Sequence, residues 1–259
     1  FETIQLIKGA AALKYGGDTS AGSIILSSKR KILIDTLFGT SFINLESNGW
    51  GGKFGSRLEK NYSSGFYIKG NFTGKRYGDF NTPNYILSNT GFKEADFSIG
   101  FGKDLVSKGW NLKYSNYNLE PGILKASHIG NVQDLFFAIN NNEPSIINDF
   151  TYDIGAPNQR ASHQKLTFKY FRSLRNDVKL DLGYNYQNNK RKEFDIRRGG
   201  RTNIPVVDLL LQTHNFMIGI SNLKTRNWDF ELGYNGLIQD NFSTPDTGVK
   251  RLIPDYIKF

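Results

Sequence analysis

The sequence predicts an all-β fold built from long antiparallel strands. After residue 30, apolar and polar side chains alternate along most of the chain, which is the period of a strand with two unlike faces. Aromatic residues make up 14% of the chain and 27 residues are glycine, a composition that favours strands and turns over helices. Several alternating segments have about ten residues, whereas strands of globular sheets usually have about five or six.

Nine segments carry this strand pattern. Seven have a clear phase, in which every second residue is apolar, although the alternation is weaker in the first of them. These seven lie at 50–58, 66–73, 95–102, 110–115, 166–170, 178–187 and 228–235. The segments at 32–45 and 207–220 are also strand-like, but their phase is ambiguous, which is compatible with a β-bulge in each.

The connections between these segments alternate in length. Short links lie near 61–63, 104–109, 173–177 and 222–227, and long polar links lie near 78–91, 119–162, 190–205 and after 240. The short link near 47–50 is an exception, because it falls among the long ones. Bacterial outer-membrane barrels have short periplasmic turns and longer extracellular loops, so this rhythm favours a membrane barrel.

A soluble β-sandwich also has alternating apolar and polar positions, so alternation alone does not distinguish it from a barrel. Strand length, the small and polar residues on the second face, and aromatic residues near strand ends favour the barrel. No apolar run reaches 18 residues, which excludes a transmembrane helix, but a barrel strand needs only about 9–11 residues. The aromatic residues near strand ends are Trp50, Trp110, Trp228, Tyr184, Tyr186 and Tyr234.

The first 26 residues predict a strand, a Lys-Gly corner, one short helical turn, a Tyr-Gly stop and a second strand. This order resembles the end of the plug domain of TonB-dependent outer-membrane receptors. Within that family it is most similar to the receptors for iron complexes and siderophores found in Bacteroidetes-type bacteria. Ala10 stands where that family usually has proline, and Ser23 where it often has glycine. The residues that fit the family pattern are Glu2, Ile4, Leu6, Ile7, Lys8, Gly9, Tyr15, Gly16, Gly22, Ile24 and Ile25.

The resemblance implies that residues 1–30 end a plug domain and that residues 31–259 form the first part of a transmembrane β-barrel of about 22 strands. The chain would then be part of a receptor two to three times as long. The implied function is active import across the outer membrane of a Gram-negative bacterium, without covalent chemistry and without a cofactor. The implied cargo is a ferric siderophore or another iron complex, with glycan, vitamin B12 and haem as alternatives on the same scaffold.

The implied partners are the TonB energy-transducing complex, the ligand, and outer-membrane lipid including lipopolysaccharide. A surface lipoprotein is a further partner to consider. The main alternative from another class is a soluble or surface-attached β-sandwich binding module, such as an adhesin or a carbohydrate-binding domain. That alternative explains the alternation and the aromatic residues but not the plug-like opening.

The net charge of +9 is compatible with nucleic acid, anionic lipid or an anionic ligand. We do not expect nucleic acid, because the aromatic residues lie in the strand repeat rather than among the basic residues. The densest basic stretch has two interpretations, a solvated loop or a site for lipopolysaccharide phosphates or an anionic chelate. It comprises Lys190, Arg191, Lys192, Arg197, Arg198, Gly199, Gly200 and Arg201.

No residue pattern indicates an enzyme or a metal site. The chain has no cysteine, and its histidines, His128, His163 and His214, lie far apart without metal-ligand spacing. We expect His214 to be packed or to face the lumen, and a metal or haem contact stays open for His128 and His163.

In the longest link, four aromatic residues lie among four acidic ones. They either cover a ligand and meet a cation, or anchor the loop on itself. These residues are Phe136, Phe137, Phe150, Tyr152, Asp134, Glu143, Asp149 and Asp153.

Overall fold

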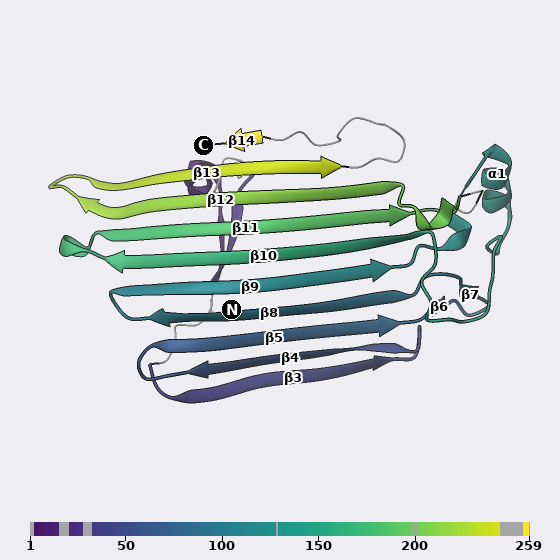
Figure 1. Ribbon diagram of the computed structural model, residues 1–259, viewed down its shortest axis with the longest axis horizontal. Coiled ribbons are helices and arrows are strands. Elements are labelled where there is room, and N and C mark those ends of the chain that lie inside the picture. Colours follow the sequence, from purple (N-terminus) through teal and green to yellow (C-terminus); the bar gives the residue numbers. More distant parts are fainter. Residues whose placement is uncertain are drawn as a thin grey trace.

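The computed structural model describes residues 3–15, 21–27, 33–127, 129–197, 199, 201–243 and 256–258. Most of them belong to one large antiparallel sheet of nine long strands (Figure 1). None of the helices in this part of the chain has the length and apolar character of a membrane-spanning helix.

The nine long strands follow one another across the sheet in chain order. Each pairs antiparallel with the strand before and after it, so every connection joins neighbours. They are β3 (Thr36–Glu46), β4 (Gly51–Asn61), β5 (Phe66–Tyr77), β8 (Phe92–Asp104), β9 (Lys108–Pro121), β10 (Asn158–Ser173), β11 (Lys179–Phe194), β12 (Val207–Lys224) and β13 (Asp229–Ser243).

The sheet is open rather than closed into a barrel. β3 forms one edge, and the three-residue β14 (Tyr256–Lys258) pairs with β13 at the other. All nine predicted strands are confirmed, with 11 to 18 residues each, and most extend beyond the predicted segments, although β3 is shorter than the predicted segment 32–45. The β-bulge suspected in 207–220 lies just beyond that range, where the register between β12 and β13 shifts between Ile220 and Leu223.

The two ends of the sheet differ in the length of their connections. Short turns at 62–65, 105–107, 174–178 and 225–228 lie at one end. The long links at 78–91, 122–157 and 195–206 lie at the other, together with the short link at 47–50 (Figure 1). The long links carry β6 (Phe80–Asn81), β7 (Ile86–Leu87) and α1 (Val132–Asn140). The predicted alternation of link lengths is therefore confirmed.

The predicted order of the N-terminal segment is also confirmed. β1 (Thr3–Ile7) pairs antiparallel with β2 (Ser23–Ser27), and the 3-10 helix η1 (Gly9–Tyr15) lies between them. Gly9 has φ +70° and Gly22 has φ +116°, backbone conformations that glycine adopts without strain. A Cβ on Gly22 would also lie 2.8 Å from the Ile7 carbonyl oxygen. The stop at Gly16 and the motif residue Glu2 lie outside the described residues.

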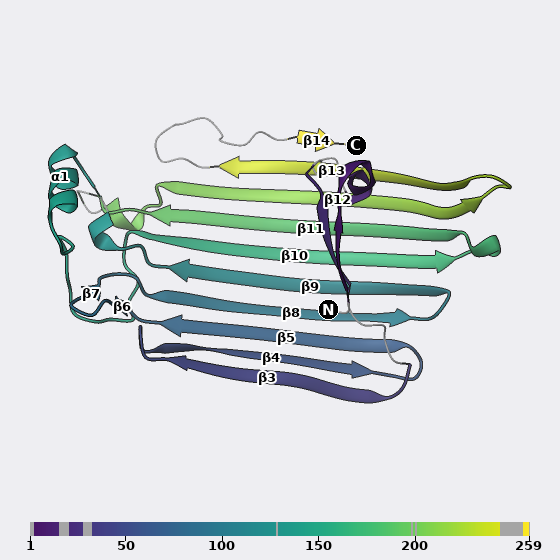
Figure 2. The ribbon, with the colours of Figure 1, turned by 180° about the vertical axis from the view of Figure 1, so that it is seen from behind.

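This N-terminal hairpin lies on one side of the sheet, behind it in Figure 1 and in front of it in Figure 2. Little apolar surface is buried in the described part of the chain, where only Ala12, Tyr67 and Tyr77 are buried hydrophobic residues. The sheet thus lacks the apolar core that a second sheet would create in a sandwich.

Candidate functional site

The strand registers place most large apolar side chains on one face of the sheet, here called the apolar face. The face is exposed: Ile99 in the middle of β8 keeps 49% of its surface accessible, and Ile43 on β3 keeps 71%. Paired residues carry this face from strand to strand across the whole sheet. Its main residues are Ile43, Leu45, Phe54, Leu58, Ile68, Phe72, Phe97, Ile99, Phe101, Trp110, Leu112, Tyr114, Leu166, Phe168, Tyr170, Leu180, Leu182, Tyr184, Tyr186, Phe216, Ile218, Ile220, Leu232, Tyr234 and Ile238.

The apolar face is a band of limited height. On β11 it extends from Leu180 to Tyr186, about 20 Å at about 3.4 Å per residue, and then gives way to Asn188, Lys190 and Lys192. The neighbouring strands β9 and β10 change at the same level, where Asn116 pairs with Gln164. Outer-membrane barrels carry an outward apolar band about 25 Å tall, so the height of this band suits a bilayer.

The predicted aromatic residues fall into three groups. Trp110 and Tyr186 lie near the two borders of the band, where amphipathic rings prefer to lie at a membrane interface. Tyr184 and Tyr234 lie inside the band. The remaining two, Trp50 and Trp228, lie beyond the strand ends, in the link after β3 and the turn before β13.

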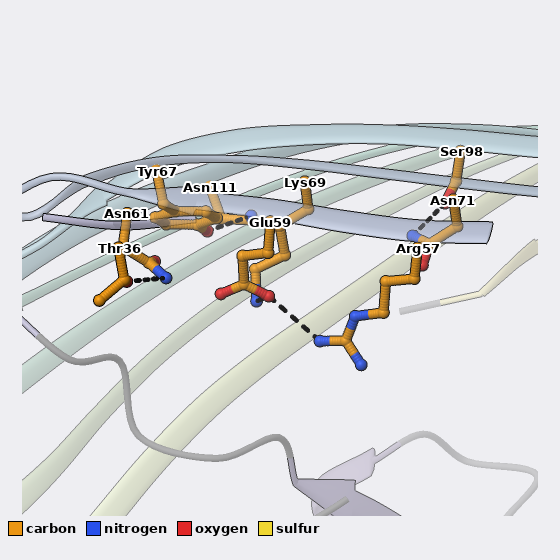
Figure 3. Close-up of polar contacts among 9 residues, drawn as sticks. All are labelled: Thr36, Arg57, Glu59, Asn61, Tyr67, Lys69, Asn71, Ser98 and Asn111. Atoms are coloured by element: carbon orange, nitrogen blue, oxygen red, sulfur yellow. Dashed lines mark hydrogen bonds and ion pairs between the residues drawn. The ribbon is translucent and has the colours of Figure 1, made fainter. Parts of the chain in front are cut away.

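The opposite face, here called the polar face, carries mainly small, polar and charged side chains, with apolar exceptions that include Phe38, Phe42, Leu119, Phe171, Leu209, Leu211 and Met217. Glu59 is 5% exposed and pairs with two cations, Arg57 and Lys69, each at 3.1 Å (Figure 3). Arg57, Glu59 and Lys69 come from adjacent strands, because Glu59 of β4 is opposite Lys69 of β5.

Tyr67 is the centre of a second polar-face contact. It is 2% exposed and lies opposite Gly102, and its hydroxyl accepts a hydrogen bond of 2.5 Å from Asn111 Nδ2 (Figure 3). A Cβ on Gly102 would meet the Tyr67 hydroxyl at 2.8 Å and also the Trp110 carbonyl oxygen. Glycine at position 102 therefore makes the room that the ring occupies.

Further polar pairs cover the rest of this face. Lys75 and Glu94 form an ion pair at 2.6 Å between β5 and β8. Asn71 Nδ2 donates to Ser98 Oγ at 3.0 Å, as Figure 3 shows. Asn215 Nδ2 donates to Asn235 Oδ1 at 2.7 Å on β12 and β13. Such a face is suited to water or to a polar domain packed against it.

Only the second half of the basic stretch lies in a loop, so the loop interpretation is wrong for its first half. Lys190, Arg191 and Lys192 belong to β11, because its pairing with β10 continues to Phe194. Alternation sends Lys190 and Lys192 to the side of the apolar face, whereas Arg191 lies on the opposite side and pairs with Glu193. Arg197, Gly199 and Arg201 lie in the link after β11, and Arg198 and Gly200 lie outside the described residues.

The two described histidines, His163 and His214, do not come together. His214 is packed on the apolar side, 4.9 Å from the Tyr186 ring, and its Nδ1 lies 2.9 Å from the Tyr184 hydroxyl. His163 lies on the polar face, with Nδ1 3.0 Å from Asn189 Nδ2. His128 lies outside the described residues. Among the residues that the structure describes, no three His, Asp or Glu side chains group as a metal site would require.

The aromatic residues of the longest link have two different roles. The Phe150 ring occupies the space beside Gly78, and Tyr152 donates a 2.5 Å hydrogen bond to the Trp50 carbonyl oxygen, so both anchor the link. Phe136 and Phe137 on α1 are 61% and 51% exposed, so they do not anchor the loop on itself. Of the acidic residues, Asp134 binds the start of α1 through Asn131, whereas Glu143, Asp149 and Asp153 are exposed.

Sequence analysis missed one residue that organises this end of the sheet. Asn89, in the left-handed region at φ +67°, donates hydrogen bonds to the carbonyl oxygens of Ile123 and Pro157, both at 2.8 Å. Its Oδ1 accepts a third bond, also of 2.8 Å, from the Gly155 amide. Asn89 thereby joins the link after β5 to both ends of the longest link. The Asn-Thr-Gly sequence at 89–91 signals a turn but not these contacts.

No protein-family model and no curated protein matches this sequence.

Proposed function

We propose that this sheet is part of a transmembrane β-barrel in the outer membrane of a Gram-negative bacterium. The observation that carries the proposal is the exposed apolar band, which extends about 20 Å along β11, close to the apolar band of about 25 Å in outer-membrane barrels, and is bordered by polar residues on the same face. A water-soluble protein rarely exposes an apolar surface of this extent. In lipid the band is solvated by acyl chains, so its exposure carries no penalty.

The proposal requires that both edges of the sheet are paired. In the described part of the chain, β3 has a partner on one side only, and each unpaired backbone group in lipid costs several kcal/mol. Further strands between β3 and the far edge would remove these edges by closing the barrel. The polar face would then line the interior.

Within that barrel we propose active import of a ferric siderophore or another iron complex, driven by the TonB complex. The support is the N-terminal hairpin, which has the strand–corner–helix–strand order of a plug end and lies on one side of the sheet (Figure 2). Ligand would bind on the long links and the plug, and no residue of this chain would form a covalent bond with it.

The test is native mass spectrometry of the full-length gene product purified in detergent from outer membranes, with metal analysis of the bound material. The proposal predicts a heat-modifiable, detergent-requiring protein that carries an iron complex. A haem, cobalamin or glycan adduct would keep the importer and change its cargo. A protein that stays soluble without detergent and carries no ligand would refute the barrel and favour the β-rich binding module.

A further inference from the structure

A shallow depression of about 320 Å³ lies on the outward side of the sheet, just beyond the apolar band. Its lining comes from four neighbouring strands, β8 to β11, at the end of the sheet that carries the long links. The charged residues that line it are Lys93, Glu120, Arg160, Lys190 and Lys192.

The strand registers place these side chains on the same face as the apolar band. Lys93 is opposite Glu120, and Arg160 is opposite Lys192. Lys190 lies four residues beyond Tyr186 on β11, so its side chain is on the Tyr186 side of the strand. The depression is therefore continuous with the apolar band, at the border of the band nearest the long links, and does not open toward the polar face.

Two of the four cations lack a counter-ion in the described part of the chain. Arg160 Nε lies 2.8 Å from Glu120, and Lys192 Nζ lies 3.0 Å from Asp208. No described carboxylate lies within ion-pair distance of Lys93 or Lys190, and both side chains are exposed. The four cations are paired with only two carboxylates, those of Glu120 and Asp208. The surface next to the apolar band is therefore positively charged.

We propose that this depression binds the phosphate groups of an outer-leaflet glycolipid, lipopolysaccharide, whose acyl chains cover the apolar band. The inference rests on the proposed membrane location. Arginine and lysine form charge-assisted hydrogen bonds with phosphate oxygens, and Lys93 and Lys190 are available for them. An amphiphile with an anionic head and apolar chains matches both parts of this surface, which a free anion or an acidic peptide does not.

The position of the depression selects the outer leaflet. It lies at the end with the long links, which face the cell exterior in outer-membrane barrels. Glycolipid phosphates lie at the border between acyl chains and sugars, and the depression lies at the border between the band and the polar ends of the strands.

The experiment measures lipid binding by the full-length protein in detergent with native mass spectrometry. The probes are bisphosphorylated lipid A, the same lipid without phosphates, and phosphatidylglycerol. The variant Arg160→Gln/Lys190→Gln/Lys192→Gln removes three cations from the depression. The matched control Lys113→Gln/Lys165→Gln/Lys169→Gln removes three cations from the polar face of adjacent strands β9 and β10. Heat-modifiable gel mobility establishes that each variant is folded.

We expect the first variant to bind lipid A at least about tenfold more weakly than wild type and the control to bind it like wild type. Lys190→Gln alone, which breaks no described ion pair, should give part of the loss. Equal binding by both triple variants, or equal binding of lipid A with and without phosphates, would overturn the inference. Stronger binding of phosphatidylglycerol than of lipid A would overturn the assignment to a glycolipid. A protein that needs no detergent would instead refute the proposed function itself.

Discussion

The polar face depends on a few side chains that are held between adjacent strands. Glu59 is nearly inaccessible and holds two cations, and Tyr67 occupies space that only a glycine opposite it leaves open. Polar groups in such positions are costly to leave unpaired, because their water is already removed. Single substitutions at these positions should therefore reduce stability more than similar substitutions elsewhere on the same face.

Glu59→Gln should reduce the stability of the folded protein by about 1–3 kcal/mol, because it leaves Arg57 and Lys69 without their shared carboxylate. The measurement is denaturant unfolding in detergent, followed by loss of the folded gel band. Glu193→Gln is the matched control, since its ion pair with Arg191 is much more exposed and should contribute less than about 1 kcal/mol. Equal losses for the two variants would contradict the special role of Glu59.

Gly102→Ala should cost about 1–3 kcal/mol, because the added methyl group collides with the Tyr67 hydroxyl and the Trp110 carbonyl oxygen. Gly100→Ala is the control on the same face of the same strand, where the nearest atom to a Cβ is Lys113 Cγ at 3.6 Å. The same unfolding measurement compares the two variants. A Gly100→Ala protein as unstable as Gly102→Ala would show that strand glycines are needed for another reason.

At the level of elements, the end of the sheet with the long links is held by contacts between distant segments. Asn89 forms hydrogen bonds with Ile123, Gly155 and Pro157, which lie 34, 66 and 68 positions further along the chain. Ser88 Oγ accepts a 2.6 Å hydrogen bond from the Asn148 amide. These bonds hold the longest link against the segment between β5 and β8. Exposed residues such as Phe136 and Phe137 are presented on that anchored link.

Asn89→Ala should loosen the longest link, since it removes three hydrogen bonds and places alanine at φ +67°. Limited proteolysis of the folded protein should cut within 122–157 several times faster than in wild type. Asn176→Ala is the control, because Asn176 has a similar φ of +56° in a short turn at the other end of the sheet. If Asn176→Ala also accelerated cleavage within 122–157, the loss of the Asn89 contacts would not be the cause.

The elements were predictable where one physical rule determined them. Period-two alternation located seven of the nine long strands with a clear phase, whereas β3 and β12 were strand-like without one, because both carry large apolar residues on both faces. Strand ends were not predictable: Asn188 to Lys192 are polar on both faces, so they resemble a loop although they are paired, and from Asn116 to Glu120 the alternation is reversed, because Tyr117 and Leu119 lie on the polar face. The Asn89 contacts were not predictable either, because no local pattern reports which segments meet across 66 residues.

At the scale of the molecule, most of the described part of the chain forms one large sheet with two faces of opposite character. Its apolar face is uncovered in the described part of the chain, and its polar face carries ion pairs and amide networks (Figure 3). In water this arrangement would drive association through the apolar face. In a membrane both faces have a suitable environment, lipid outside and a polar interior.

The central claim, that the apolar face contacts lipid, is tested most directly by single-cysteine fluorescence quenching in the membrane. The chain has no cysteine, so Ile99→Cys on the apolar face and Ser98→Cys on the polar face can each carry one bimane label. We predict that brominated lipids quench the label at position 99 several-fold more than the label at position 98. Equal quenching at the two positions, or stronger quenching at position 98, would contradict the account.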